Sequence, residues 1–171
     1  MNTAFFIIGQ VLTLVSYVVF WMSRFKKNKK NILIWDNVSR FFAIISFIFL
    51  GTYDGIKNTL YVVLRNIVGQ VTHNKSQNYK TKMFIIMLII LISMYCFNFR
   101  GISTMFIAIC GIINLYGVII TDEQGIRKFG MLGSLFYMAF LASTQNITGV
   151  ICEIICFFVM LTSYVKYKKV K

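Results

Sequence analysis

The sequence contains no proline and very little negative charge, with 5 acidic residues against 18 Lys and Arg among 171 residues. Charged residues make up 13% of the chain, about half the share usual in soluble proteins. So few charges cannot cover the surface of a soluble domain of this length. The composition therefore excludes an ordinary soluble globular protein, although it does not indicate an activity.

The sequence also lacks the short motifs that carry catalysis or bind metals. It has no Gly-rich phosphate loop, no H-E-x-x-H helix and no G-x-S-x-G turn. Its four cysteines lie inside apolar segments without metal-binding spacing, and its one histidine, His73, has no partner motif. We therefore expect no enzymatic activity, no metal and no cofactor.

Long apolar runs are what the sequence does contain: 58% of residues are hydrophobic and the mean hydropathy is +0.73. A membrane-spanning helix needs roughly 20 apolar residues, and short polar breaks divide this chain into seven such segments. The N-terminal segment lacks the basic region of a signal peptide. The sequence thus predicts an all-α membrane protein with seven transmembrane helices, at Thr3–Met22, Asn31–Gly51, Tyr53–Thr72, Met83–Phe97, Gly101–Ile120, Lys128–Ala142 and Asn146–Val165.

The third segment is the most polar of the seven, and the distribution of basic residues tests whether it spans. With seven spans and an outside N-terminus, 14 basic residues lie inside and 2, Lys57 and Arg100, lie outside. Without the third span the split becomes 6 against 11, so the positive-inside rule favours seven spans with N-out/C-in topology. The net charge of +13 then reflects topology and attraction to anionic lipids rather than nucleic-acid binding. The inside residues are Arg24, Lys26, Lys27, Lys29, Lys30, Lys75, Lys80, Lys82, Arg127, Lys128, Lys166, Lys168, Lys169 and Lys171.

A weak internal repeat relates the two halves of the chain. The segment from Ile48 aligns with the segment from Ala139, which superposes the second and third helices on the sixth and seventh. Helices 1–3 and 5–7 would then run in the same sense, with helix 4 restoring the orientation between them. We predict a 3+1+3 arrangement of two parallel three-helix bundles, with residues 1–72 and 101–171 as the bundles and 73–100 as the linker helix.

Ionisable groups within a bilayer are costly, which makes each of them a functional candidate. Arg65 in the third segment and Glu153 in the seventh differ in depth by roughly 6–7 Å at 1.5 Å per residue. We expect them to face each other across a central cavity and to contribute to a solute-binding site. A static ion pair that only orders the bundle is the alternative.

Four deep amides are further candidates for binding a solute: Asn58, Asn66, Asn114 and Gln10. Asn58, Arg65 and Asn66 lie on or beside one polar stripe of the third helix. Buried amides need partners or water, so each either binds solute or ties two helices together.

Asp36 and Arg40 are spaced i,i+4 in the inner part of the second helix, where they can pair along one face. We interpret them as a candidate inner gate. The alternative is interfacial charge beside the lysine-rich loop.

Several of these features occur together between Ser23 and Gln70: a basic loop after the first helix, F-L-G-T-Y at Phe49–Tyr53, Gly55 and Asn58 in a turn, and L-R-N at residues 64–66. This stretch of about 48 residues resembles the YgjV-type family of bacterial inner-membrane proteins. The resemblance implies a multi-pass protein of the bacterial cytoplasmic (inner) membrane.

The 3+1+3 plan is also similar to that of SWEET sugar transporters, PnuC-type vitamin carriers and the KDEL receptor. SWEETs use paired asparagines on the third helix of each bundle, and Asn66 would fill one place while Phe157 stands in the other. The resemblance implies a carrier of a small polar solute at mid-membrane. The alternative is a non-transporting receptor, scaffold or accessory subunit, and the sequence leaves the oligomeric state open.

Overall fold

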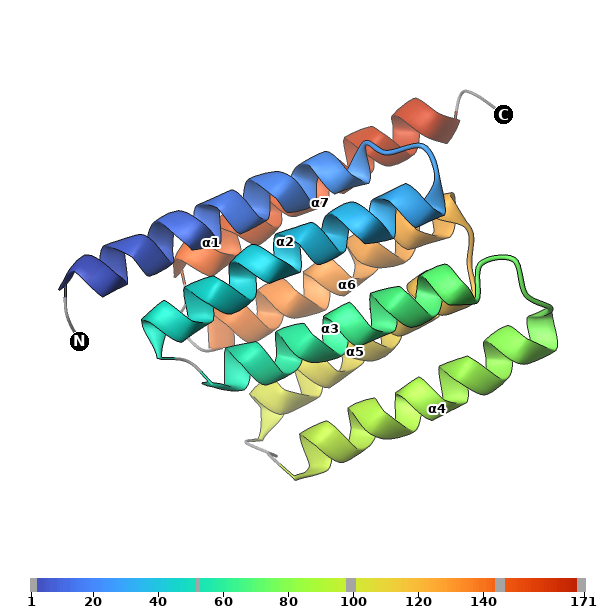
Figure 1. The fold of residues 1–171 in the computed structure, drawn as a ribbon, viewed down its shortest axis with the longest axis horizontal. Helices are drawn as coiled ribbons and strands as arrows, with labels where there is room; N and C mark the ends of the chain where they lie inside the picture. Colours follow the sequence, from blue (N-terminus) through green and yellow to red (C-terminus); the bar gives the residue numbers. More distant parts are fainter. Residues whose placement is uncertain (1–2, 52, 98–100, 144–146, 169–171) are drawn as a thin grey trace. The chain divides into compact units, whose positions relative to one another are not determined.

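The protein is helical throughout the residues that its computed structural model describes, which are 3–51, 53–97, 101–143 and 147–168. Seven α-helices follow one another along the chain (Figure 1). The described residues include no strand. The helices are α1 (Thr3–Arg24), α2 (Lys29–Leu50), α3 (Tyr53–Val71), α4 (Gln77–Cys96), α5 (Ile102–Ile119), α6 (Glu123–Ser143) and α7 (Ile147–Lys168).

Five of these helices are long and apolar enough to cross a membrane, judged over the described residues: α1, α2, α4, α5 and α7. The other two, α3 and α6, carry more charge, including Lys57 and Arg65 in α3 and Glu123 and Arg127 in α6. Large apolar side chains are exposed along the helices, among them Phe5, Leu14 and Phe41. Such exposure suits contact with lipid rather than with water.

The sequence predicted two helix starts too late. α4 begins at Gln77 rather than Met83, and α6 begins at Glu123 rather than Lys128. Both extensions are polar, so a hydrophobic run cannot reveal them. At α6 the carboxylate of Asp122 accepts a hydrogen bond of 2.8 Å from the backbone N–H of Gly125, which is the geometry of an N-cap.

The turn between α2 and α3 depends on glycine. Gly51 ends α2 with φ of 68°, and its N–H bonds back to the carbonyl of Ile48. This left-handed conformation costs glycine little. Gly51 thus ends α2, and α3, which begins at Tyr53, runs beside α2 (Figure 1).

The chain divides into two compact units, residues 1–70 and 71–171. In the first unit α1 packs along α2, and serine and threonine hydroxyls join the two helices. Ser46 Oγ lies 2.7 Å from Thr13 Oγ1 and donates to the carbonyl of Gly9 at 2.8 Å. A Cβ on Gly9 would meet Leu50 Cγ at 2.7 Å, so glycine permits this close approach.

In the second unit α6 packs against both α5 and α7, and α4 packs against α5. Glycines lie at each of these contacts. A Cβ on Gly117 would meet Phe129 Cβ at 2.8 Å, and one on Gly130 would meet Met160 Sδ at 2.7 Å. At the α4–α5 contact a Cβ on Gly111 would lie 3.1 Å from the side chain of Leu91. Small residues at helix contacts are typical of membrane bundles.

Candidate functional site

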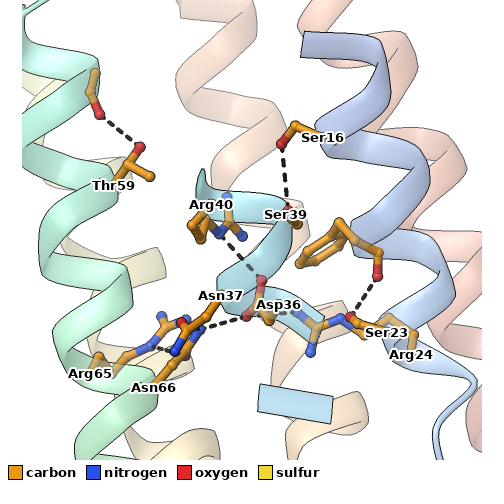
Figure 2. A network of polar contacts seen from close by, with 12 residues as sticks. Ser16, Ser23, Arg24, Asp36, Asn37, Ser39, Arg40, Thr59, Arg65 and Asn66 are labelled. Atoms are coloured by element: carbon orange, nitrogen blue, oxygen red, sulfur yellow. Dashed lines mark hydrogen bonds and ion pairs between the residues drawn. The ribbon is translucent and has the colours of Figure 1, made fainter. Parts of the chain in front are cut away.

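A buried carboxylate organises the polar side chains of the first unit (Figure 2). Asp36, two turns into α2, is 1% exposed. Its Oδ2 lies 3.3 Å from Nη2 of Arg24, which ends α1, and its Oδ1 lies 3.3 Å from Nε of Arg40, one turn further along α2. Asp36 and Arg40 thus form the ion pair that their i,i+4 spacing predicts.

Asn66 extends this network from α2 to α3. Its Nδ2 donates to Asp36 Oδ2 and to Asn37 Oδ1, each at 3.0 Å. Its Oδ1 accepts from Arg65 Nε at 3.3 Å and from Arg65 Nη2 at 3.2 Å. Arg65 therefore joins the network through a neutral amide, as Figure 2 shows.

An aromatic ring supports two of the guanidinium groups. Arg24 Cζ lies 4.1 Å from the centre of the Phe20 ring, and Arg40 Cζ lies 5.1 Å from it. The negative face of an aromatic ring attracts cations at this range. Phe20 lies one turn before Arg24 on α1, so the local geometry of that helix presents the ring to the pair.

The network gathers more positive than negative charge in a place with little water. Arg24 and Arg65 are each 6% exposed and Asn66 is fully buried, while the side chain of Arg40 keeps 28% of its surface. Three guanidinium groups surround one carboxylate. Buried charge is tolerated when it is paired and hydrogen-bonded, and only part of this positive charge is balanced within the network.

The second unit buries two opposite charges, each of which forms a hydrogen bond with a serine hydroxyl. Arg127 on α6 is 1% exposed and donates from Nε to Ser163 Oγ of α7 at 2.9 Å, with its Cζ 4.6 Å from the centre of the Tyr167 ring. Glu153 on α7 is 8% exposed and accepts from Ser134 Oγ of α6 at 2.9 Å. In each case a hydrogen bond with a serine hydroxyl joins α6 to α7: Ser163 accepts from Arg127, and Ser134 donates to Glu153.

The predicted site residues are divided between the two units. Asp36, Arg40, Arg65 and Asn66 come together in the first unit, whereas Glu153 belongs to the second. Within its own unit Arg65 contacts Asn66, and Glu153 contacts Ser134. The expected pairing of Arg65 with Glu153 stays a prediction.

The remaining predicted amides lie outside the Asp36 network. Asn114 Nδ2 donates to the carbonyl of Cys110 one turn earlier at 3.0 Å, and a Cβ on Gly133 would collide with the Asn114 amide, so this side chain lies in the α5–α6 contact. Gln10 on α1 is exposed, and Asn58 on α3 is half-buried.

Sequence reasoning missed Arg24, Asn37 and Arg127 as members of polar contacts. The charge pattern predicts inner loops for Arg24, Lys29 and Arg127, but each of them lies in a helix and is buried. Basic residues near helix ends are ordinarily explained by topology. Burial of these three depends on tertiary packing, which a hydropathy profile does not contain. Arg100, Lys169 and Lys171, which entered the charge count, lie outside the described residues.

Metal-binding side chains do not gather in the part of the chain that the structure describes. No group of three or more His, Cys, Asp or Glu residues forms there. Apart from the one carboxylate of Asp36, the side chains of the network are guanidinium and amide groups, which are not the donors that metals prefer. The chemistry this network offers is hydrogen-bond donation and positive charge.

Comparison of the sequence with models of protein families identifies the family of this chain. A family model described as Imp-YgjV, bacterial inner membrane protein, matches residues 7–171. The chain belongs to this family. The match extends over nearly the whole chain, far beyond the stretch from Ser23 to Gln70 that first suggested it, and it places the protein in the bacterial inner membrane. No curated protein and no solved structure matches the chain.

Membership of the Imp-YgjV family agrees with the apolar helices, since a multi-pass inner-membrane protein needs several of them. The family description gives a location and no activity. The functional argument therefore rests on the residues themselves, and on the Asp36 network above all.

Proposed function

We propose that this inner-membrane protein is a carrier of a small polar solute, without enzymatic activity. The observation that carries the proposal is the buried network of Arg24, Asp36, Arg65 and Asn66 on the helices of the first unit. An arginine in the middle of a membrane helix costs roughly 2.5–3.5 kcal/mol on insertion scales. In the proposed topology Arg65 lies within the third span, and a residue this costly is expected to be kept for a function.

The proposed carrier has seven spans with N-out/C-in topology and a 3+1+3 plan. Two apolar helices, α1 and α2, frame the network, and the more polar α3 supplies Arg65 and Asn66. A polar third span is expected if one of its faces contacts a wet pathway rather than lipid. Anionic lipids at the cytoplasmic face would attract the exposed lysines near the helix ends.

The ion pairs of Asp36 provide an inner gate for such a carrier. Arg24 comes from α1 and Asp36 from α2, so movement of α1 against α2 must break or rebuild the 3.3 Å contact. Two packings with different pairings are the physical basis of alternating access. We assign Asp36, Arg24 and Arg40 to this gate, and Arg65 and Asn66 to solute binding.

The alternative is a receptor, scaffold or accessory subunit that does not transport. The observation that favours it is that Asp36 contacts side chains from α1, α2 and α3 at once. Contacts with three helices would fix these helices in a single arrangement. Such a protein would expose α3 to water from one side only. The two functions therefore differ in the accessibility of the polar face of α3.

Cysteine accessibility tests this difference. Residues 1–70 contain no cysteine, so alanine at Cys96, Cys110, Cys152 and Cys156 gives a thiol-free background. Val62→Cys places a thiol on the α3 face that Asn58 and Asn66 share, since Val62 lies one turn from each of them. Leu64→Cys is the matched control, because Leu64 is 44% exposed on the apolar face of the same helix.

A carrier predicts that a membrane-impermeant maleimide labels Val62→Cys from both sides of the membrane, in right-side-out and inverted vesicles. It labels Leu64→Cys from neither side. Labelling of Val62→Cys from one side only would contradict the carrier and favour the receptor or scaffold. In the carrier, Arg65→Ala and Glu153→Ala are expected to abolish uptake while leaving a folded protein.

A further inference from the structure

The charges of the first unit do not balance within that unit. Residues 1–70 contain two acids, Asp36 and Asp54, and Asp54 belongs to the first turn of α3, 11 positions before Arg65, or about 16 Å along the helix. Asp36 therefore serves the guanidinium groups of Arg24, Arg40 and Arg65. This leaves an excess of positive charge in a region from which water is largely excluded.

Arg65 carries the excess. Asp36 contacts Arg24 and Arg40 directly, whereas Arg65 reaches it only through the amide of Asn66. Among the described residues of the first unit, no carboxylate pairs with Arg65 within 4.0 Å. A buried guanidinium strongly favours a negative partner in such surroundings.

The geometry of Arg65 also leaves one edge of its fork for a ligand. The bonds to Asn66 use Nε and Nη2. The guanidinium has five N–H groups, and the edge formed by Nη1 and the second N–H of Nη2 has no hydrogen-bond partner among the described residues. Two parallel N–H groups on such an edge match the two oxygens of a carboxylate or phosphate.

We propose that Arg65 binds an oxyanion, a carboxylate or a phosphate, bidentately through Nη1 and Nη2. The inference deepens the proposed function by naming the class of solute, and it rests on that function for the step of transport. The anion neutralises the excess charge of the network. Asn66 positions the guanidinium, and Arg24 and Arg40 add to the attractive field from the far side of Asp36.

Glu153 of the second unit is the alternative negative partner for Arg65, because it is a buried carboxylate within the same chain. It accepts a hydrogen bond from Ser134 within its own unit. If Glu153 were the counter-charge of Arg65, an added anion would gain nothing in the native protein. This difference makes the proposal testable.

Thermal unfolding of the full chain in a non-ionic maltoside detergent provides the binding assay. A thiol-reactive fluorophore follows unfolding through the buried Cys152 and Cys156. The probes are inorganic phosphate and succinate, with chloride at matched ionic strength as the control. We expect phosphate or succinate, or both, to raise the Tm by roughly 5 °C near saturation, and chloride to have no such effect.

Three variants locate the site. Arg65→Gln removes the charge and is expected to abolish the shift, while Arg65→Lys keeps the charge without the fork and is expected to weaken binding by about tenfold or more. Arg127→Gln is the matched control, since it removes a buried guanidinium of the second unit and is expected to keep the full shift. If Arg65→Gln does not fold, Arg65→Lys decides.

An unchanged shift in folded Arg65→Gln or in Arg65→Lys would overturn the assignment, as would the absence of any shift in the native protein. A shift that appears only in Glu153→Gln would identify Glu153 as the internal counter-charge, and would overturn it too.

Two further arms separate the sources of the oxyanion and the step of transport. Phosphatidylglycerol added to the micelles presents a headgroup phosphate. If only this lipid stabilises the protein, and Arg65→Gln loses the effect, Arg65 binds an oxyanion. That result would overturn the claim that the oxyanion belongs to a soluble solute. Uptake of labelled phosphate or succinate into proteoliposomes, lost in Arg65→Gln, would support solute and carrier together. Binding without uptake would contradict the carrier function but not oxyanion binding at Arg65. Uptake of a neutral solute by Arg65→Gln would contradict oxyanion binding as part of transport but not the carrier function.

Discussion

The two helical units bury charge in different ways. In the first unit Arg24, Asp36 and Arg40 contact one another, and Asn66 links them to Arg65. In the second unit Arg127 and Glu153 each form a hydrogen bond of 2.9 Å with a different serine hydroxyl. The charged side chains of the first unit contact one another, whereas Arg127 and Glu153 hydrogen-bond to separate serines.

The spacing of the residues explains why these two hydrogen bonds of the second unit involve different serines. Arg127 and Ser134 are seven residues apart on α6, or about 10 Å, and Glu153 and Ser163 are ten apart on α7, or about 15 Å. The two hydrogen bonds therefore lie at different levels of the α6–α7 contact and share no residue. In the first unit a change at Asp36 reaches three helices, which is what a switching element requires.

Removal of the shared carboxylate should have the largest effect. Asp36→Asn leaves the buried guanidinium groups of Arg24 and Arg65 and the half-buried one of Arg40 without the acid between them. Breaking a buried ion pair by removing one partner costs about 3–5 kcal/mol, so we expect a loss of that size in the free energy of unfolding. Titration with a denaturing detergent in mixed micelles measures it.

Glu153→Gln is the matched control in the second unit. The amide oxygen can still accept the hydrogen bond from Ser134, and the substitution removes a buried charge, so we expect a change within about 1 kcal/mol. Equal losses for Asp36→Asn and Glu153→Gln would show that the charges of the first unit are no more coupled than those of the second.

Helix packing is a second point of comparison, because helices of the second unit also approach one another closely at glycines. Gly117→Ala brings a methyl group against Phe129 Cβ at 2.8 Å, where the neighbour is fixed to its backbone. We expect a loss of about 1–3 kcal/mol. Gly130→Ala is the control, because its neighbour, Met160 Sδ at 2.7 Å, belongs to a flexible side chain that can move. The same mixed-micelle titration compares the two, and a smaller loss for Gly117→Ala would mean that α5 and α6 separate easily.

The sequence predicts the helices of this fold well, because long apolar runs have few other structures available in a membrane protein. It fails where a helix begins in polar residues, as α4 does at Gln77 and α6 at Glu123. It also predicts the Asp36–Arg40 contact, since that pair lies within one helix. Local spacing is sufficient for these features.

The rest of the candidate site depends on packing between helices. The hydrogen bond from Asn66 to Asp36 joins residues 30 positions apart, and its existence follows from how α3 returns along α2. Arg24 was assigned to a loop because basic residues at helix ends serve topology. No periodicity in the sequence distinguishes it from Lys26, whose Nζ lies 4.3 Å from the centre of the Trp35 ring.

The smallest predicted effect concerns the hydroxyl contacts that join α1 to α2. Ser46→Ala removes contacts of 2.7 Å to Thr13 Oγ1 and 2.8 Å to the carbonyl of Gly9, and hydrogen bonds between membrane helices contribute about 0.6 kcal/mol on average, with a maximum near 1.7. We expect a loss within this range. Ser39→Ala removes a contact of 3.4 Å to Ser16, which is too long to contribute as much, so its loss should be the smaller in the same titration. If the order of the two were reversed, hydroxyl contacts would not explain the packing of the first unit. Close helix approach at glycine, as at Gly9 in the first unit and at Gly117 in the second, would remain as a basis of packing common to both units.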